Sequence, residues 1–130
     1  MGVDRLDLYQ IHWPHPLIHD GTIMRGMATL QRSGLIDEVG VSNYSLPRWR
    51  TAEEALGSLV LSNQVNYSLV VRSPERDLLP FAEAHDRVVI ASSPLAQGAS
   101  VGQVRPGQPT HRQRKGGQPA FCPRQPRPVQ

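Results

Sequence analysis

Apolar and polar positions alternate in short stretches that recur along the first 98 residues. Residues 6–13 alternate between the two kinds and meet Pro14, a pattern typical of a β-strand that ends in a turn. Three later stretches, short and rich in Val, Ile and Leu, have the character of buried strands. The predicted strands cover residues 6–13, 35–41, 59–65 and 87–91.

Helical signals fill the intervals between these strands. In residues 21–33 the apolar positions are spaced as on one face of a helix, and Gly34 follows where a C-terminal cap is expected. Pro47 and Pro74 each suit a first helical turn, where a backbone N–H has no partner, and Ser45 is a candidate N-cap. The predicted helices cover residues 21–33, 46–56 and 74–85.

This order of elements predicts an α/β fold with a parallel sheet. Strands that alternate with helices indicate βαβ units, whose crossovers are right-handed. Four strands leave two open sheet edges, and parallel sheets are normally covered on both faces. We therefore expect an incomplete α/β fold. The alternative is a small, self-sufficient flavodoxin-like domain, although such domains usually have five strands.

Composition divides the chain at Gly98. Residues 99–130 contain six of the 12 prolines and no acidic residue, Ile, Leu or Met, which predicts a disordered tail. The tail carries six basic residues, whereas residues 1–98 carry eight basic and 11 acidic residues. The sequence pI of about 9.6 is thus a property of the tail. We do not expect nucleic-acid binding, and the abrupt change suggests a shift of reading frame.

Several functional classes are not expected. Cys122 is the single cysteine, so neither an intrachain disulfide nor a cysteine metal cluster is predicted, and no metal site is assigned. The N-terminus lacks the apolar core of a signal peptide, and no apolar run approaches the roughly 20 residues that span a bilayer. A cytoplasmic protein without membrane contact is therefore expected.

Polar side chains stand at the end of every predicted strand. They are His12 after the first, Ser42 and Asn43 after the second, Gln64 on the third, and a polar loop that begins at Ser92 after the fourth. In parallel α/β folds, function lies at the carboxyl ends of the strands. Amide and hydroxyl groups can hold an uncharged amide such as a nicotinamide carboxamide, and a histidine can donate to a carbonyl. Each residue also has a purely structural alternative, as a turn or a core amide.

Four segments at these strand ends resemble those of the aldo-keto reductase family. They are DRLDLYQIHWP at 4–14, GVSNY at 40–44, NQVNYS at 63–68 and IASSPLAQG at 90–98. They resemble the family's fourth, fifth, sixth and seventh strand segments, in that order. The resemblance implies a partial (β/α)8 TIM barrel over residues 1–98, followed by the tail.

The resemblance also implies a reaction and a cofactor site. Members transfer hydride between NADPH or NADH and a small carbonyl substrate. His12 matches the histidine that orients the substrate carbonyl, while Ser42, Asn43 and Gln64 match the residues that hold the nicotinamide carboxamide. The loop over the cofactor pyrophosphate is matched by Ser93, Leu95, Gln97 and Gly98.

The chain departs from the family pattern in two ways. Ser92 stands where many members stack an aromatic ring on the nicotinamide, and the family's catalytic aspartate, tyrosine and lysine belong to segments that precede the resemblance. The expectation is therefore a truncated fragment that is inactive alone. The alternative is a non-catalytic interaction module that dimerises through its open sheet edges or complements another chain.

Overall fold

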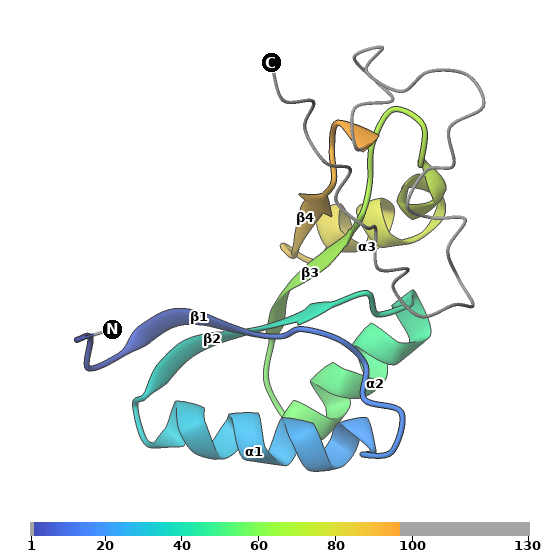
Figure 1. Ribbon diagram of the computed structural model, residues 1–130. Helices are drawn as coiled ribbons and strands as arrows, with labels where there is room; N and C mark the ends of the chain where they lie inside the picture. The colour runs from blue at the N-terminus through green and yellow to red at the C-terminus, as the bar shows by residue number, and fades with distance from the viewer. Residues whose placement is uncertain (1, 97–130) are drawn as a thin grey trace, which may run out of the picture.

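The predicted alternation of strands and helices is confirmed by the computed structural model, which describes residues 2–96 (Figure 1). The strands are β1 (Leu6–Ile11), β2 (Ile36–Ser42), β3 (Val60–Asn66) and β4 (Val88–Ser92). The helices are α1 (Asp20–Arg32), α2 (Leu46–Leu56), the 3₁₀ turn η1 (Ser73–Arg76) and α3 (Leu78–Ala84). The domain boundary at Gly98 and the tail lie outside the described residues.

The four strands form one parallel sheet in the order β1-β2-β3-β4. In its register, Ile11 pairs with Val41, Val41 with Asn63, and Asn63 with Val89. The carboxyl ends of all four strands therefore meet along one edge of the sheet. Helices α1 and α2 lie side by side on one face of the sheet, and α3 packs beside β4 (Figure 1).

The hydrophobic core lies between the sheet and these helices, and Trp49 of α2 is its largest fully buried side chain. Its indole N–H donates to the carbonyl of Val60 at 3.0 Å, so the polar atom of the ring is satisfied. Its ring meets Phe81 of α3 edge to face, with 5.3 Å between the centroids. Trp49 thus joins α2, β3 and α3 into one packed unit.

Three local predictions need correction. The first strand ends at Ile11 rather than at residue 13. The helix predicted over residues 74–85 is divided at Asp77, whose φ of −143° interrupts the helical backbone and whose carboxylate accepts from the N–H of Leu78 at 2.7 Å. Ser45 does occupy the N-cap position of α2, but its side chain makes no capping bond.

The two outer strands are much less buried than the two inner ones. On β1, Leu8 is 36% and Tyr9 45% exposed, and on β4 Val88 is 47% exposed. Within residues 2–96, β1 and β4 each pair with a strand on one side only. No helix in this part of the chain combines the length and apolar character that crossing a membrane requires.

Candidate functional site

The register of the sheet brings most of the predicted site residues to one edge. Ser42 of β2 pairs directly with Gln64 of β3, and Asn43 follows Ser42. His12 follows Ile11, whose partner Val41 precedes Ser42, so His12 belongs to the same row. The sequence predicted this grouping, because the carboxyl ends of parallel strands share an edge.

The turn after β2 is held by three hydrogen bonds around Ser42. The Ser42 hydroxyl donates to the Gln64 carbonyl at 2.9 Å and accepts from the Asn43 side-chain amide at 2.9 Å. The backbone N–H of Asn43 donates to the same carbonyl at 2.8 Å. Ser42 is therefore a buried residue that stabilises this turn, and its hydroxyl acts as both donor and acceptor within the chain.

Two amide groups at this edge keep hydrogen-bonding capacity. The Asn43 side chain donates once, to Ser42, and its carbonyl oxygen has no partner among residues 2–96. The side-chain amide of Gln64, which is half buried, has none in that range either. Together they offer acceptors and donors to an uncharged amide. Gln64 is therefore not the satisfied core amide of the structural alternative, because its side chain is only half buried and has no partner in this range.

Asn63 is a residue of the site that the sequence did not single out. It is fully buried, its side-chain NH₂ donates to the Tyr44 carbonyl at 2.9 Å, and its side-chain oxygen accepts from the Tyr44 N–H at 3.4 Å. Neighbouring residues of a strand point to opposite faces, so Gln64 faces away from this contact. Asn63 extends the pairing of β2 and β3 past the last strand residue. The sequence does offer a clue to Asn63: it is followed by a second amide, Gln64, and two neighbouring strand residues cannot both face the same side of the sheet.

A polar layer lies directly beneath the site on the same sheet face. The Gln10 amide donates to the Ser62 hydroxyl at 2.8 Å, and this bond passes over Gly40 of the intervening strand. A Cβ at Gly40 would lie 2.6 Å from the Gln10 Cγ and closer still to the Ser62 hydroxyl. The register of β2 against β3 also shifts here, between Val39 and Gly40. The absence of a side chain at Gly40 thus permits the bridge that underlies the site.

His12 is placed in the row but is not fixed there. It is exposed, and its ring lies 6.3 Å from that of Trp13 at a tilt of 57°. It makes no hydrogen bond to another residue of the described range. The predicted catalytic residue is therefore near the amides in register, without the contacts that would orient its imidazole.

The loop after β4 begins as predicted and then leaves the described range. Ser93 and Ala96 both have positive φ, 54° and 48°, and the Ala96 N–H donates to the Ser93 carbonyl at 2.8 Å. Ser93 and Leu95 are exposed. The two remaining predicted residues of this loop, Gln97 and Gly98, lie outside the described residues. Their assignment to the cofactor stays a prediction.

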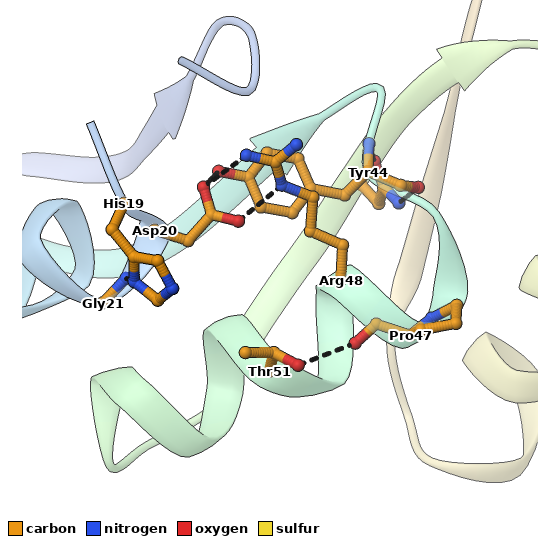
Figure 2. Close-up of polar contacts among 8 residues, drawn as sticks. His19, Asp20, Gly21, Tyr44, Pro47, Arg48 and Thr51 are labelled. Carbon is orange, nitrogen blue, oxygen red and sulfur yellow. Dashed lines mark hydrogen bonds and ion pairs between the residues drawn. The ribbon is translucent and has the colours of Figure 1, made fainter. Parts of the chain in front are cut away.

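A charged cluster forms around Tyr44, the residue that follows Asn43; Figure 2 shows its members Asp20, Tyr44 and Arg48. The carboxylate of Asp20 accepts from the Tyr44 hydroxyl at 3.0 Å and from two guanidinium nitrogens of Arg48. The bonds from Arg48 lower the pKa of Asp20 despite its burial. Burial and the Asp20 contact raise the pKa of Tyr44 to about 12. Asp20 and Arg48 are thus paired with each other, whereas Ser42, Asn43 and Gln64 are uncharged side chains.

Comparison with known proteins identifies the family of the chain. The model of the aldo/keto reductase family matches residues 1–124. The chain belongs to the aldo/keto reductase family. An uncharacterized oxidoreductase of Mycobacterium tuberculosis is 53% identical over 111 residues, which cover 82% of this chain and 34% of that protein.

Solved structures of aldo/keto reductases share the fold. The crystal structure of a thermostable aldo-keto reductase in complex with epalrestat is 38% identical, with a TM-score of 0.69, over 73% of this chain and 35% of that one. An aldo/keto reductase from Klebsiella pneumoniae, solved with NADP and acetate, is 32% identical, with a TM-score of 0.63, over 77% of this chain and 35% of that one.

The chain spans about a third of the length of these relatives. Its four parallel strands therefore correspond to part of the aldo/keto reductase barrel, as the sequence predicted, and not to a self-sufficient flavodoxin-like domain. The family match continues to residue 124, past the boundary predicted at Gly98.

Proposed function

We propose that this chain supplies the nicotinamide subsite of an NADPH- or NADH-dependent carbonyl reductase, together with the histidine that orients the substrate carbonyl. The observation that carries the proposal is that the side-chain oxygen of Asn43 and the side-chain amide of Gln64 have no hydrogen-bond partner within residues 2–96. They lie at the carboxyl edge of the sheet, beside the Ser42 hydroxyl, which donates to the Gln64 carbonyl and accepts from the Asn43 amide. The family relationship supports the same cofactor, because the Klebsiella relative was solved with NADP.

The donor set fits a carboxamide. A carboxamide presents an NH₂ group and a carbonyl, which the free oxygen of Asn43 and the amide of Gln64 can satisfy in a pair of hydrogen bonds. Burial of Ser42 and Asn63 beneath them fixes the backbone from which the two amides project. The bound dinucleotide would supply the hydride. His12, in the same row, would donate a hydrogen bond to the substrate carbonyl and so favour the charge that develops on its oxygen.

Binding of NADP⁺ to the chain tests this assignment. We expect saturable shifts in the NMR signals of the Asn43 and Gln64 side-chain amides. Replacing either residue with Ala should weaken binding by about two-fold to ten-fold, the value of a neutral hydrogen bond. Gln31→Ala is the control, because Gln31 is an amide near the start of β2, at the opposite end of the sheet, where it donates to the Asp37 carbonyl at 2.8 Å. A dispersed spectrum without saturable shifts, or equal losses in all three variants, contradicts the proposal.

We further propose that the 130 residues alone do not reduce carbonyls. The resemblance assigns the proton donor to a segment that precedes residues 4–14, and general acid catalysis contributes about 10²–10⁴-fold. Purified chain mixed with NADPH and 4-nitrobenzaldehyde should therefore show no NADPH oxidation above the uncatalysed rate. Steady consumption that scales with protein concentration contradicts this part of the proposal. A cytoplasmic location stays a prediction.

A second candidate function, self-association, rests on the outer strands. Leu8 and Tyr9 on β1 and Val88 on β4 are exposed next to strand edges that have no neighbour within residues 2–96. Such edges present free N–H and C=O groups that pair readily with another chain. Measurement of the solution mass decides this candidate: a discrete dimer is expected, and a monomer across micromolar concentrations contradicts it.

A further inference from the structure

A buried carboxylate lies directly behind the nicotinamide subsite. Asp20, the first residue of α1, is 7% exposed. One of its oxygens accepts from the Tyr44 hydroxyl at 3.0 Å and from Nη2 of Arg48 at 2.8 Å, and the other accepts from Nε of Arg48. Figure 2 shows the three side chains, here called the Asp20 clamp, converging from α1, the turn after β2, and α2.

The carboxylate is not needed to begin its own helix. His19 already occupies the N-cap position, and its Nδ1 accepts from the N–H of Gly21 at 3.1 Å. Asp20 instead reaches residues 24 and 28 positions further along the chain. Burying a carboxylate costs free energy, and an apolar contact of similar shape often stabilises a fold as well as a buried ion pair. The direction of the side chain therefore indicates a role at Tyr44.

Tyr44 is held at both of its ends. Its backbone N–H and carbonyl are both bonded to the Asn63 side chain, and its hydroxyl is bonded to Asp20. The Arg48 guanidinium covers its ring at 5.0 Å from the centroid. Only 1% of Tyr44 is exposed. A residue fixed at both ends leaves its backbone little freedom to rotate.

Asn43, the residue before Tyr44, has a left-handed backbone. Its φ is 61°, a region that few non-glycine residues occupy and that asparagine enters more readily than most. Conformations of this kind persist when the surrounding structure enforces them. Ser42 and Gln64 hold one side of Asn43, and Tyr44 holds the other.

We propose that Asp20 is a positioning residue of the nicotinamide subsite, acting through Tyr44 to keep Asn43 in the left-handed conformation that presents its side-chain oxygen. The proposal rests on the proposed function for the identity of the ligand. Asp20 would touch neither cofactor nor substrate. Its buried carboxylate would serve to hold the side-chain amide of Asn43 in position.

The test is a double-mutant cycle with NADP⁺ as the probe. Asp20→Asn should weaken NADP⁺ binding by about ten-fold, as expected for loss of a hydrogen bond to a charged group. In the Asn43→Ala background the same change should have no further effect, because Asp20 would then have no amide to position. Equal losses in both backgrounds overturn the proposal.

Glu53→Gln is the matched control. Glu53 binds Arg87 at 2.7 Å, and the two side chains are 18% and 17% exposed, at the opposite end of the sheet. It should lower the stability as Asp20→Asn does while leaving NADP⁺ affinity unchanged. If Asp20→Asn does not fold, Tyr44→Phe replaces it, because this change removes only the hydroxyl contact. A loss of affinity in Glu53→Gln equal to that in Asp20→Asn contradicts positioning.

A measurement without ligand separates the two proposals. The Asn43 N–H donates to the Gln64 carbonyl, so its hydrogen-exchange rate reports the turn in the free protein. Asp20→Asn should accelerate this exchange about ten-fold more than Glu53→Gln does. If the unmodified chain does not bind NADP⁺, the proposed function fails, and this comparison alone then decides the positioning role. Equal exchange rates in the two variants overturn it.

Discussion

The two inner strands, β2 and β3, differ sharply from the two outer strands, β1 and β4. On the inner pair, Val39, Val41 and Val60 are fully buried, and even the polar Asn63 is inaccessible. On the outer pair, the apolar Tyr9 and Val88 are each almost half exposed. The inner strands bury their apolar side chains against the helices that cover one face of the sheet. Each outer strand has one edge without a neighbouring strand in residues 2–96.

The candidate site divides along the same line. Ser42, Asn43 and Gln64 belong to the inner pair and are held by bonds formed within the chain. His12 follows the outer strand β1 and has no such bond in the described range. Under the proposed function, the residues assigned to the cofactor are therefore held by contacts within this segment. The orientation of His12, the residue assigned to the substrate carbonyl, instead depends on what covers β1.

The largest expected effect comes from the core behind the inner pair. Trp49→Ala removes a fully buried indole and should lower the free energy of unfolding by about 3–5 kcal/mol, measured by urea denaturation. Trp13→Ala is the control, because Trp13 is 59% exposed, and it should change stability by no more than about 0.5 kcal/mol. Similar losses of stability in the two variants would contradict the difference in burial between the core behind the inner strands and the region that follows β1.

The polar layer beneath the site should tolerate no side chain at Gly40. Gly40→Ala places a Cβ 2.6 Å from the Gln10 Cγ and should cost about 1–3 kcal/mol of stability. Gly26→Ala is the matched change at an open position of α1, where an added Cβ would meet no atom within 4 Å beyond the adjacent residues and the local helix backbone, and it should instead add about 0.5–1 kcal/mol. Thermal denaturation of both variants checks the opposite signs, and a neutral Gly40→Ala contradicts the tight layer.

The outer strands should govern association more than stability. Tyr9→Lys places a charge on the exposed edge strand and should shift a dimer toward monomer, with a change in stability within about 0.5 kcal/mol. Sedimentation equilibrium measures the shift. Leu17→Lys, at a side chain 90% exposed in the loop after β1, serves as the control. An equal shift from both substitutions contradicts pairing through the edge.

The last expected effect is absent near neutral pH, because it is the pH dependence that the Asp20 clamp imposes at the extremes of the pH range. Tyr44 has a pKa of about 12 in the folded protein against 10.0 for the free side chain, so its stabilising contribution is complete below pH 10 and is lost as pH rises toward 12. The pKa of Asp20 is lowered below 3.8, so its contribution is present above pH 3.8 and is lost as pH falls through its folded value.

Tyr44→Phe separates these contributions. Denaturation at a series of pH values should show a shallower alkaline decline in this variant than in the unmodified chain, because a phenylalanine has no proton to lose. An alkaline decline of unchanged slope would show that Tyr44 is not its source.

Local patterns in the sequence were sufficient for the elements and for the edge that they share. Alternation and short apolar runs located the four strands. The helices between them indicated that the strands run parallel. The grouping of the polar residues could then be predicted, because the carboxyl ends of parallel strands lie along the same edge of the sheet. The division of the last helix at Asp77 was missed, since Pro74 and the acids after it suit an uninterrupted helix equally well.

Interactions between distant side chains could not be predicted in this way. The bond from Gln10 to Ser62 spans 52 positions and requires the absent side chain of Gly40 between them. The contact of Asp20 with Arg48 spans 28 positions and depends on how α1 packs on α2. Alternation alone also could not tell which of Asn63 and Gln64 shares a face with Ser42, since that depends on the register of β3 and on the shift beside Gly40, and only the family resemblance selected Gln64.

Native-state hydrogen exchange of the unliganded chain tests most directly whether the cofactor half of the site is preformed. We predict that the amide of Asn43 exchanges as slowly as those of the buried strand β2, because it donates at 2.8 Å to the Gln64 carbonyl. Amides of β1 near His12 should exchange faster. An Asn43 amide that exchanges as in an unfolded peptide, while β2 stays protected, would contradict the account.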